Sequence, residues 1–386
     1  MGTSAEPEVS VVIPCLNESE TLETCIRKAV SCLEKHGLSG EVVVADNGSS
    51  DGSQEIAVKA GARVVHVEEK GYGNALRGGI EAARGRYVIM GDADDSYDFS
   101  SFYPFIEELR KGADLVMGNR FRGGIMPGAM PWKNHYIGNP IQTKIGQIMF
   151  RCPIGDFNCG LRGFTKEAYG DMGLVTTTWE FASEMVIKAS LKRMNVVEVP
   201  IILHKDGRSH PPHLQPWRAG WRNIRFMLLH SPRWLFLIPG LILLFLGALG
   251  FGLVLPGPFS IGVAAFDVTT LVISSLACIL AFQVVAFGVL ARAFGAAQGL
   301  LPPDKKIAWF RRWFSLEIAL LGGITLILLG AVLLVAMFVS WYKSGFGPLE
   351  YEQAMRLAIP AVTLVALGVQ IGFISFFISV LDLRTK

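Results

Sequence analysis

Four long apolar segments in the last part of the chain constrain its fold more than any other feature. They lie near residues 234–255, 268–291, 316–340 and 357–381. Each is long enough for a helix to cross a hydrocarbon core of roughly 30 Å, which takes about 20 residues. The sequence therefore predicts an all-α membrane domain of four transmembrane helices over residues 233–386.

The basic residues between these segments predict which side of the membrane each connection faces. The connection between the second and third segments carries Arg292, Lys305, Lys306, Arg311 and Arg312. The connection at 256–267 has no Lys or Arg, and that at 341–356 has only Lys343 and Arg356. Because basic connections stay in the cytoplasm, we expect a multi-pass plasma or inner membrane protein with both termini and the preceding domain cytoplasmic. Residues 1–14 also lack the pattern of a cleaved signal peptide.

Residues 1–210 show the alternation of strands and helices that is typical of an α/β domain. Strand candidates rich in β-branched residues occur at 9–14, 41–46, 63–67 and 86–91. Stretches with helical spacing occur between them, at 20–36, 53–60 and 72–84. Strands that alternate with helices predict a mostly parallel sheet.

The segment 211–232 links the two predicted domains and has the pattern of an amphipathic juxtamembrane helix. Its apolar face would contain Trp217, Trp221, Ile224, Met227 and Leu228, beside Arg218, Arg222 and Arg225. Such a helix lies in the headgroup layer of a membrane. An ordinary surface helix is the alternative.

Charge and cysteine content exclude other classes of protein. Residues 1–232 carry 26 Lys and Arg against 27 Asp and Glu, without a dense basic patch, so we expect no nucleic-acid partner. The six cysteines lack the spacing of a zinc site, and free thiols are expected.

Polar clusters follow three of the predicted strands. They begin at Asn17, at Asp46 and at Asp92. In open parallel sheets, ligands bind at the carboxyl ends of the strands, so we expect these clusters to form one site. Asp92 and Asp94 are alternate carboxylates directly after an apolar strand, which suits Mg²⁺ or Mn²⁺ completed by substrate phosphates. A solvated acidic turn is the alternative for this pair.

The segments VVIPCLNESETL, VVVADNGSSDGS and GDADDSYD occur in that order along the chain. Together they closely resemble family 2 glycosyltransferases of the GT-A fold, and within that family the dolichol-phosphate mannosyl- and glucosyltransferase branch. The resemblance covers about residues 9–230. It implies a Rossmann-like nucleotide-sugar-binding domain ahead of the membrane helices.

The same resemblance implies roles for particular residues. Nucleotide-sugar contacts fall on Pro14, Asn17, Glu18, Asp46, Lys70, Asp92 and Arg120. Metal ligation falls on Asp92 and Asp94, catalytic roles fall on Asp94, Asp156 and Arg208, and acceptor-phosphate contacts fall on Lys205, Arg208 and Arg162. The alternatives are a turn-forming Asx pair at Asp46 and Asn47, helix capping for the glycines after Lys70, and solvated surface charge for Arg120, Lys205 and Arg208. Asn158 departs from the family pattern, which puts an acceptor contact at that position in doubt.

The function that follows is inverting transfer of one hexose from a nucleotide sugar to a polyprenyl phosphate, undecaprenyl or dolichyl. The stretch from Gly118 to Pro140 favours UDP-glucose over GDP-mannose by resemblance. The lipid phosphate is already anionic, so positioning and charge compensation would dominate over general-base catalysis.

Two alternatives stay open, besides the GDP-mannose enzyme just named. A processive polysaccharide synthase would carry Q-x-x-R-W, whereas residues 215–218 read Gln-Pro-Trp-Arg. A membrane scaffold or transporter would need charged residues inside its helices, whereas Asp267, Glu317 and Asp382 fall near predicted segment ends. The transmembrane domain is also a candidate surface for a homo-oligomer.

Overall fold

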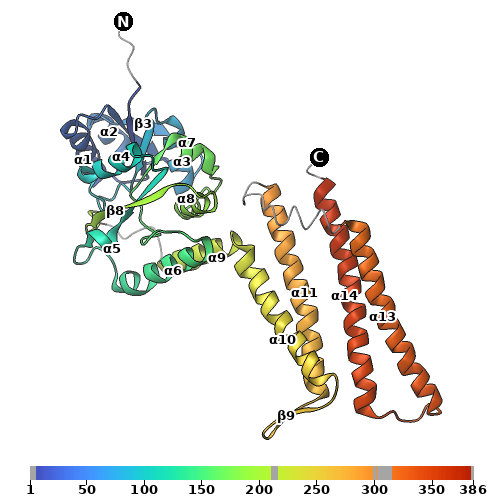
Figure 1. The fold of residues 1–386 in the computed structure, drawn as a ribbon. Coiled ribbons are helices and arrows are strands. Elements are labelled where there is room, and N and C mark those ends of the chain that lie inside the picture. Colours follow the sequence, from blue (N-terminus) through green and yellow to red (C-terminus); the bar gives the residue numbers. More distant parts are fainter. Residues whose placement is uncertain (1–5, 210–215, 299–300, 302–314, 384–386) are drawn as a thin grey trace. The chain divides into compact units, whose positions relative to one another are not determined.

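The computed structural model describes residues 6–209, 216–298, 301 and 315–383 (Figure 1). The chain divides into two compact units, Met1–Met227 and Leu228–Lys386. This division falls inside the segment 211–232 that was expected to link the two domains. Residues 210–215, which include the first Pro-Pro pair, and residues 302–314, which include Lys305, Lys306, Arg311 and Arg312, lie outside the described residues.

The described part of the first unit contains one sheet of eight strands. They are β1 Val9–Cys15, β2 Gly40–Asp46, β3 Arg63–His66, β4 Tyr87–Met90, β5 Leu115–Asn119, β6 Gly124–Ile125, β7 Arg162–Thr165 and β8 Val196–Leu203. The four strands predicted from β-branched runs are confirmed to within one residue at each end. The sequence analysis proposed none of the strands beyond residue 91.

The sheet has the order β3-β2-β1-β4-β7-β5-β8-β6 and is mostly parallel, as expected. Among the described strands of this sheet, β7 alone runs antiparallel to its neighbours. In the parallel half, Val12 of β1 pairs with Val43 of β2 and with Met90 of β4. Strands β2, β1 and β4 therefore end side by side at one edge of the sheet.

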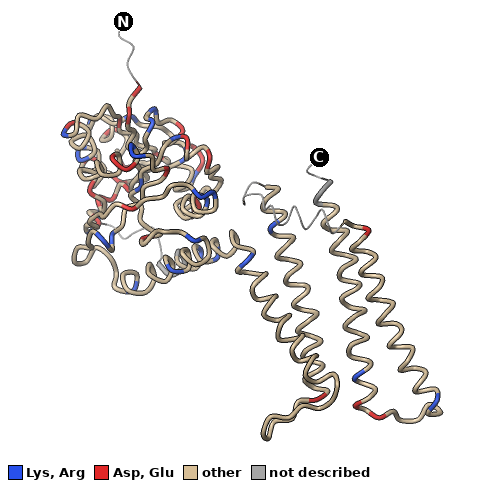
Figure 2. The backbone as a smooth tube through the Cα atoms, in the orientation of Figure 1, with Lys and Arg blue, Asp and Glu red and all other residues tan. Residues whose placement is uncertain are grey.

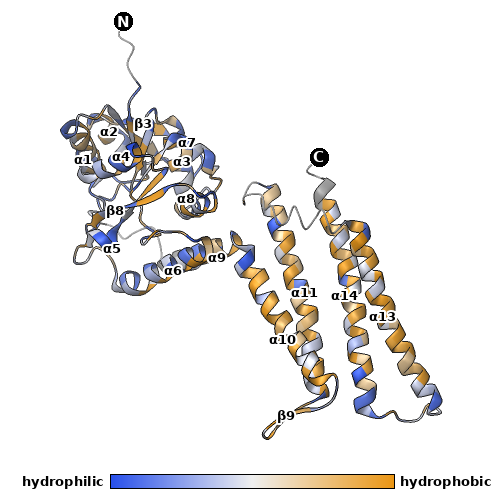
Figure 3. Ribbon diagram, in the orientation of Figure 1, coloured by the Kyte–Doolittle hydropathy of each residue, from blue (hydrophilic) through white to orange (hydrophobic). Residues whose placement is uncertain are grey.

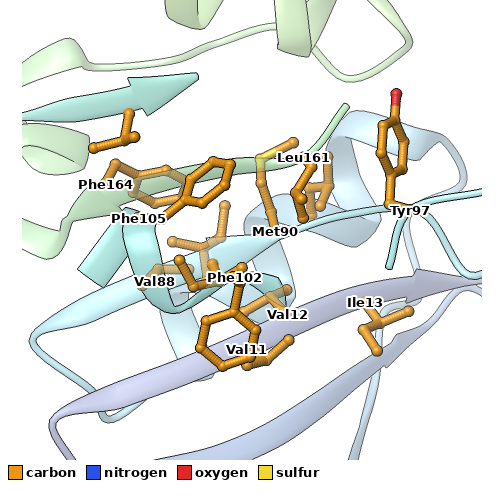
Figure 4. Packing of buried hydrophobic residues seen from close by; sticks show 14 of the residues in the cluster. Val11, Val12, Ile13, Val88, Met90, Tyr97, Phe102, Phe105, Leu161 and Phe164 are labelled. Carbon is orange, nitrogen blue, oxygen red and sulfur yellow. The ribbon is translucent and has the colours of Figure 1, made fainter. Parts of the chain in front are cut away.

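Helices cover the sheet and connect its strands (Figure 1). They are α1 Leu22–Lys35, α2 Ser53–Lys59, α3 Tyr72–Ala82, α4 Tyr103–Arg110, α5 Arg120–Gly123, α6 Asn139–Phe150, α7 Lys166–Met172, α8 Glu180–Leu191 and α9 Pro216–Leu229. Apolar side chains of the strands pack against the helices in a core that includes Val11, Val88, Phe102, Phe105 and Phe164, all fully buried (Figure 4). Burial of these side chains fixes the strand edge on which the site is built.

The described part of the second unit has four helices long and apolar enough to cross a membrane, in agreement with the sequence prediction. The spans are Arg233–Val254, which includes α10 Ile238–Val254, then α11 Val268–Ala297, α13 Leu316–Lys343 and Tyr351–Val380 of α14 Tyr351–Leu383. A short hairpin, β9 Phe259–Ile261 and β10 Ala264–Phe266, follows α10. Figure 3 shows apolar residues along all four helices, and Figure 2 shows their charged residues near the ends.

Small residues allow close approach between the membrane helices. A Cβ added to Gly330 of α13 would lie 2.7 Å from the carbonyl oxygen of Ala361 in α14. At one end of the unit, Arg356 of α14 forms an ion pair with Asp267 and donates to the carbonyl of Val254. Helix contacts through small residues are typical of membrane proteins, where packing replaces the hydrophobic effect as the driving force.

Candidate active site

The loops after β1 and β2 are joined by Asn17. This residue adopts the left-handed conformation, with a φ of 58°. Its backbone N–H donates to Ser49 Oγ at 2.9 Å, and its Oδ1 accepts from the backbone N–H of Ser50 at 2.9 Å. Pro14 is buried in β1, so it supports this turn from the core side. The two loops therefore form one surface, on which Asn17 is exposed.

Asp46 is the last residue of β2, and its side chain organises the loop that follows. It accepts hydrogen bonds from the backbone N–H of Gly48 and of Ser49, each at 3.1 Å, and from Gln54 Nε2 at 2.7 Å. Burial raises the pKa of Asp46, and the bonds from Ser49 and Gly48 lower it by more, so the pKa lies below its ordinary value. Asp46 is therefore a carboxylate at neutral pH.

Lys70 and Gly71 bring a third loop to the same edge. Lys70 Nζ donates to the carbonyl oxygen of Asn47 at 2.6 Å, and the backbone N–H of Gly71 donates to Asn47 Oδ1 at 2.8 Å. Because Asn47 directly follows Asp46, the ammonium group of Lys70 lies beside the loop after β2. This places a cation next to the acidic end of that strand.

Asp92 and Asp94 follow β4, the strand on the other side of β1. Asp92 Oδ1 accepts from the Tyr72 hydroxyl at 2.8 Å, while Asp94 Oδ1 accepts from Ser96 Oγ at 2.6 Å. Burial and the negative charge of Asp94 raise the pKa of Asp92 to about 6. Two adjacent carboxylates held this way favour a bound cation.

Arg208 lies against these carboxylates. Its guanidinium contacts Glu18 Oε1 at 3.0 Å, Asp94 Oδ2 at 3.1 Å and the carboxylate of Asp206. The backbone N–H of Gly207 also donates to the carbonyl oxygen of Asp94 at 3.0 Å. Gly207 and Arg208 belong to the loop that was expected to meet the lipid phosphate. This loop therefore packs against Asp94, one of the two expected metal ligands.

Lys205 belongs to the same loop as Arg208 but has a different environment. Its side chain is exposed, whereas the Arg208 side chain is only 10% exposed. Lys205 and Arg208, two of the three cations expected at the acceptor phosphate, are thus not equivalent. One is held among carboxylates, and the other extends into solvent.

Arg120 and Asp156 form a buried pair, and the substrate contacts expected for both stay predictions. Arg120 donates to both carboxylate oxygens of Asp156, each at 2.7 Å, and its backbone N–H adds a bond at 3.0 Å. Asp156 is fully buried and Arg120 is 7% exposed. A bidentate bond of this kind engages both oxygens of Asp156 and fixes the two side chains against each other.

Arg162 is also buried, and its expected contact with an acceptor phosphate stays a prediction. It is 1% exposed and donates to the carbonyl oxygens of Cys159, at 2.9 Å, and of Ala182. Burial lowers the pKa of Arg162. It stands at the start of β7 and ties that strand to α8.

Asn158 takes part in an amide network instead of facing an acceptor. Its Nδ2 donates to Asn139 Oδ1 and Gln142 Oε1, and its Oδ1 accepts from Asn223 Nδ2 at 3.0 Å. Asn223 Nδ2 also donates to Gln142 Oε1 at 2.6 Å. The network fastens α9 to α6, which lie side by side in Figure 1.

Comparison with known proteins decides the family. Residues 10–173 match the glycosyl transferase family 2 domain, and residues 289–382 match the glycosyltransferase family 2 C-terminal transmembrane region. A low-salt glycan biosynthesis hexosyltransferase of Haloferax volcanii is 36% identical over 374 residues, which cover 96% of this chain and 88% of that protein. The chain belongs to glycosyltransferase family 2.

Two further relatives come from Haloferax volcanii. A dolichyl-phosphate hexose transferase is 28% identical, and the match covers 55% of this chain and 89% of that protein. A second glycosyltransferase is 31% identical, with coverage of 55% and 68%. Membership makes the chain an enzyme with a membrane region, which decides against a non-enzymatic scaffold or transporter.

Among solved structures, this chain is similar to glucosyl-3-phosphoglycerate synthase from Mycobacterium tuberculosis, determined with Mn²⁺, uridine diphosphate and glucosyl-3-phosphoglycerate. The identity is 22% and the TM-score is 0.46, over 58% of this chain and 80% of that one.

The donor set of this family 2 enzyme fits a divalent cation shared with a substrate. Among the described residues, no group of three or more His, Cys, Asp or Glu side chains is arranged to hold a metal alone. Asp92 and Asp94 supply two carboxylates at one strand end, and a hard cation held by one or two carboxylates takes its other ligands from phosphate and water. Mg²⁺ or Mn²⁺ fits this pair.

Sequence reasoning missed Tyr72 and Asp206. Tyr72 donates to Asp92, and Asp206 ion-pairs with Arg208. Both lie in segments quoted for other residues, the glycine segment after Lys70 and the basic loop after β8. Only tertiary contacts over 20 residues or more bring Tyr72 to Asp92, so local spacing gave no signal.

Proposed function

We propose that this enzyme transfers one hexose, with inversion, from a nucleotide sugar to a polyprenyl phosphate at the cytoplasmic face of the membrane, and that UDP-glucose is its donor. The observation that carries the proposal is the convergence of Asp46, Asn17 and the Asp92–Asp94 pair on one strand edge, in a chain with four candidate membrane spans. The hexosyltransferase and dolichyl-phosphate hexose transferase names of the relatives support it.

On this proposal, the first two strand ends hold the nucleoside. Asp46 is an ionised acceptor for ribose or base donors, as acidic residues at strand ends are in dinucleotide-binding folds. Asn17 and Glu18 flank the same surface on the loop after β1. Lys70, on the neighbouring loop, balances the negative charge of the donor's phosphates.

Asp92 and Asp94 hold the divalent cation, which would neutralise the departing nucleoside diphosphate. Arg208 stands beside Asp94, where the acceptor phosphate must approach the sugar. An anionic phosphate oxygen needs no strong base, so the protein's task is to bring two negatively charged groups together. Arg208 and the exposed Lys205 supply the cations for the acceptor.

Exposed apolar side chains on α6, the preceding turn and α9 support a lipid acceptor. Trp132, Tyr136, Ile141 and Trp221 are each at least half exposed. The cation Lys144 is also exposed and stands on α6. Exposed apolar side chains together with a lysine are suited to the headgroup layer, and α9 ends four residues before the first span begins at Arg233.

The test incubates the purified full-length protein with Mn²⁺, undecaprenyl phosphate and either UDP-glucose, UDP-galactose or GDP-mannose. We expect one hexose per lipid, found by mass spectrometry, with UDP-glucose as the preferred donor and a β linkage by NMR. Preference for GDP-mannose would make the enzyme a mannosyltransferase, and a ladder of products would indicate a processive synthase. No glycolipid with any donor would overturn the lipid-phosphate acceptor.

The topology and assembly of the membrane domain are separate proposals. A reporter fused after Lys386 should be cytoplasmic, and tags near Gly257 and Gly345 should be accessible from outside. A C-terminus on the outer side would overturn the proposed orientation. Homo-oligomerisation through the transmembrane domain predicts a cross-linked dimer in native membranes, and a purely monomeric pattern would contradict it.

A further inference from the structure

Tyr72 holds the carboxylate of Asp92 in one orientation. Its hydroxyl donates to Asp92 Oδ1 at 2.8 Å. On the other side, a Cβ added to Gly160 would lie only 2.7 Å from Asp92 Oδ2. The carboxylate is thus confined between a hydrogen bond and a glycine.

The segment from Thr176 to Trp179 holds Tyr72 in turn. The rings of Tyr72 and Trp179 are stacked, with centroids 4.5 Å apart and planes 15° from parallel. The backbone N–H of Asn74 donates to the carbonyl oxygen of Thr177 at 3.1 Å. Gly71 has a φ of 132°, and a Cβ there would lie 2.4 Å from the same carbonyl. The start of α3 is therefore fixed against this segment.

The same segment is attached to the juxtamembrane helix α9. Glu180 follows Trp179, and its Oε1 lies 2.8 Å from Arg222 Nη2 of α9. Arg222 also donates to Thr178 Oγ1 at 3.2 Å. The two residues that flank Trp179 in the chain are thus both bound by one arginine of α9.

We propose that Tyr72 is a positioning residue for Asp92, and that α9 keeps it in place through Arg222, Glu180 and Trp179. The inference rests on the proposed function, because it takes Asp92 as a metal ligand. Outer hydrogen-bond partners orient ligating carboxylates, and their loss typically weakens metal binding 10- to 100-fold. The juxtamembrane helix then sets the affinity of the donor site for its cation.

The test measures Mn²⁺ binding to the full-length protein in nanodiscs with saturating UDP, by electron paramagnetic resonance of the free ion. Tyr72→Phe keeps the stacked ring and removes one hydroxyl, so it should raise the dissociation constant for Mn²⁺ about 10-fold. Tyr103→Phe is the matched control, because Tyr103 also stacks, on His36 at 3.9 Å, and should leave Mn²⁺ binding unchanged. Wild-type affinity in Tyr72→Phe would overturn the proposal.

A double-mutant cycle tests the link to α9. Arg222→Gln alone should weaken Mn²⁺ binding about 3-fold, since an exposed ion pair contributes little. In the Tyr72→Phe background the same change should have no further effect, because the link then ends at a missing hydroxyl. Independent, multiplying effects would overturn the role of α9.

Two further variants separate the causes of failure. Trp179→Phe keeps an aromatic stack and should retain the affinity for Mn²⁺. Trp179→Ala removes the stack and should weaken Mn²⁺ binding by the same factor as Tyr72→Phe. If Mn²⁺ binds and Asp94→Ala abolishes binding while Tyr72→Phe does not alter it, the metal site stands and this inference fails. A wild type that binds no Mn²⁺ with UDP overturns the metal site and this inference together.

Discussion

Two arginine–carboxylate pairs in the first unit have similar chemistry and opposite settings. Arg120 and Asp156 meet in a bidentate contact at 2.7 Å, and the Asp156 side chain is fully buried. Arg208 meets Asp94 at 3.1 Å and is shared with Glu18 and Asp206. The first pair is closed on itself. The second is one cation among three carboxylates, so it retains an excess of negative charge.

The difference shows why charge pairing alone does not locate a site. In a closed buried pair each charge is satisfied, and removing one partner strands the other in a medium of low dielectric constant. At the Asp94 edge, the carboxylate excess favours further cations, and Asp92 adds to it. Mutation of Asp94 or Arg208 is therefore expected to change the rate of the reaction, whereas mutation of Asp156 is expected to change the stability of the fold.

The largest effect is expected at the open edge. Asp94→Ala should lower hexose transfer by at least about 10³-fold, because a metal contributes several kcal/mol of charge stabilisation in the transition state. The melting temperature should change little, and excess EDTA should inactivate the wild type. Asp171→Ala, at an exposed aspartate of α7, is the control. Full activity in EDTA would contradict the metal assignment.

At the closed pair, Asp156→Asn should reduce the free energy of unfolding by about 3–5 kcal/mol, because it leaves the Arg120 charge buried and unpaired. Thermal unfolding in detergent measures the loss. Changing both residues, Arg120→Met with Asp156→Leu, should restore much of the stability. If the Asp156→Asn variant is instead stable and has a raised Michaelis constant for the lipid, Asp156 contacts the acceptor.

Arg208→Ala tests the open pair from the cation's side. Loss of a charge-assisted contact costs about 1.5–3 kcal/mol, or roughly 10- to 150-fold. We expect the Michaelis constant for the lipid phosphate to rise by this factor. The affinity for the nucleotide sugar, measured by calorimetry, should change less. Arg208→Lys should recover part of the activity. A loss confined to nucleotide affinity would assign Arg208 to the donor.

The smallest effect is expected at Lys205, the exposed neighbour of Arg208. Lys205→Ala should weaken use of the lipid only about 2- to 3-fold at low salt, since exposed charges contribute little. The difference from wild type should disappear in high salt, because the interaction is screened. Initial rates at two ionic strengths measure it, and a salt-independent loss would place Lys205 in a buried contact.

Much of the fold and part of the site followed from the sequence. The β-branched runs and helical spacing of the first 91 residues predicted the strands, and apolar length predicted the four membrane spans. The polar residues after β1, β2 and β4 were expected together, because parallel strands end at a common edge. The later strands were missed, since β5, β7 and β8 lie beyond the regular alternation that made the first four recognisable.

The sequence by itself determined where Asp46, Asp92 and Asp94 would lie, because a strand end is a local property. It could not determine whether a charged side chain is exposed or is buried in an ion pair. Asp156 lies 36 residues from Arg120, and only folding brings both its oxygens onto that guanidinium. In the same way, Arg208 reaches Asp94 across 114 residues and Arg222 reaches Glu180 across 42. Burial and pairing depend on which distant segments pack together, so the tertiary structure alone decided these contacts.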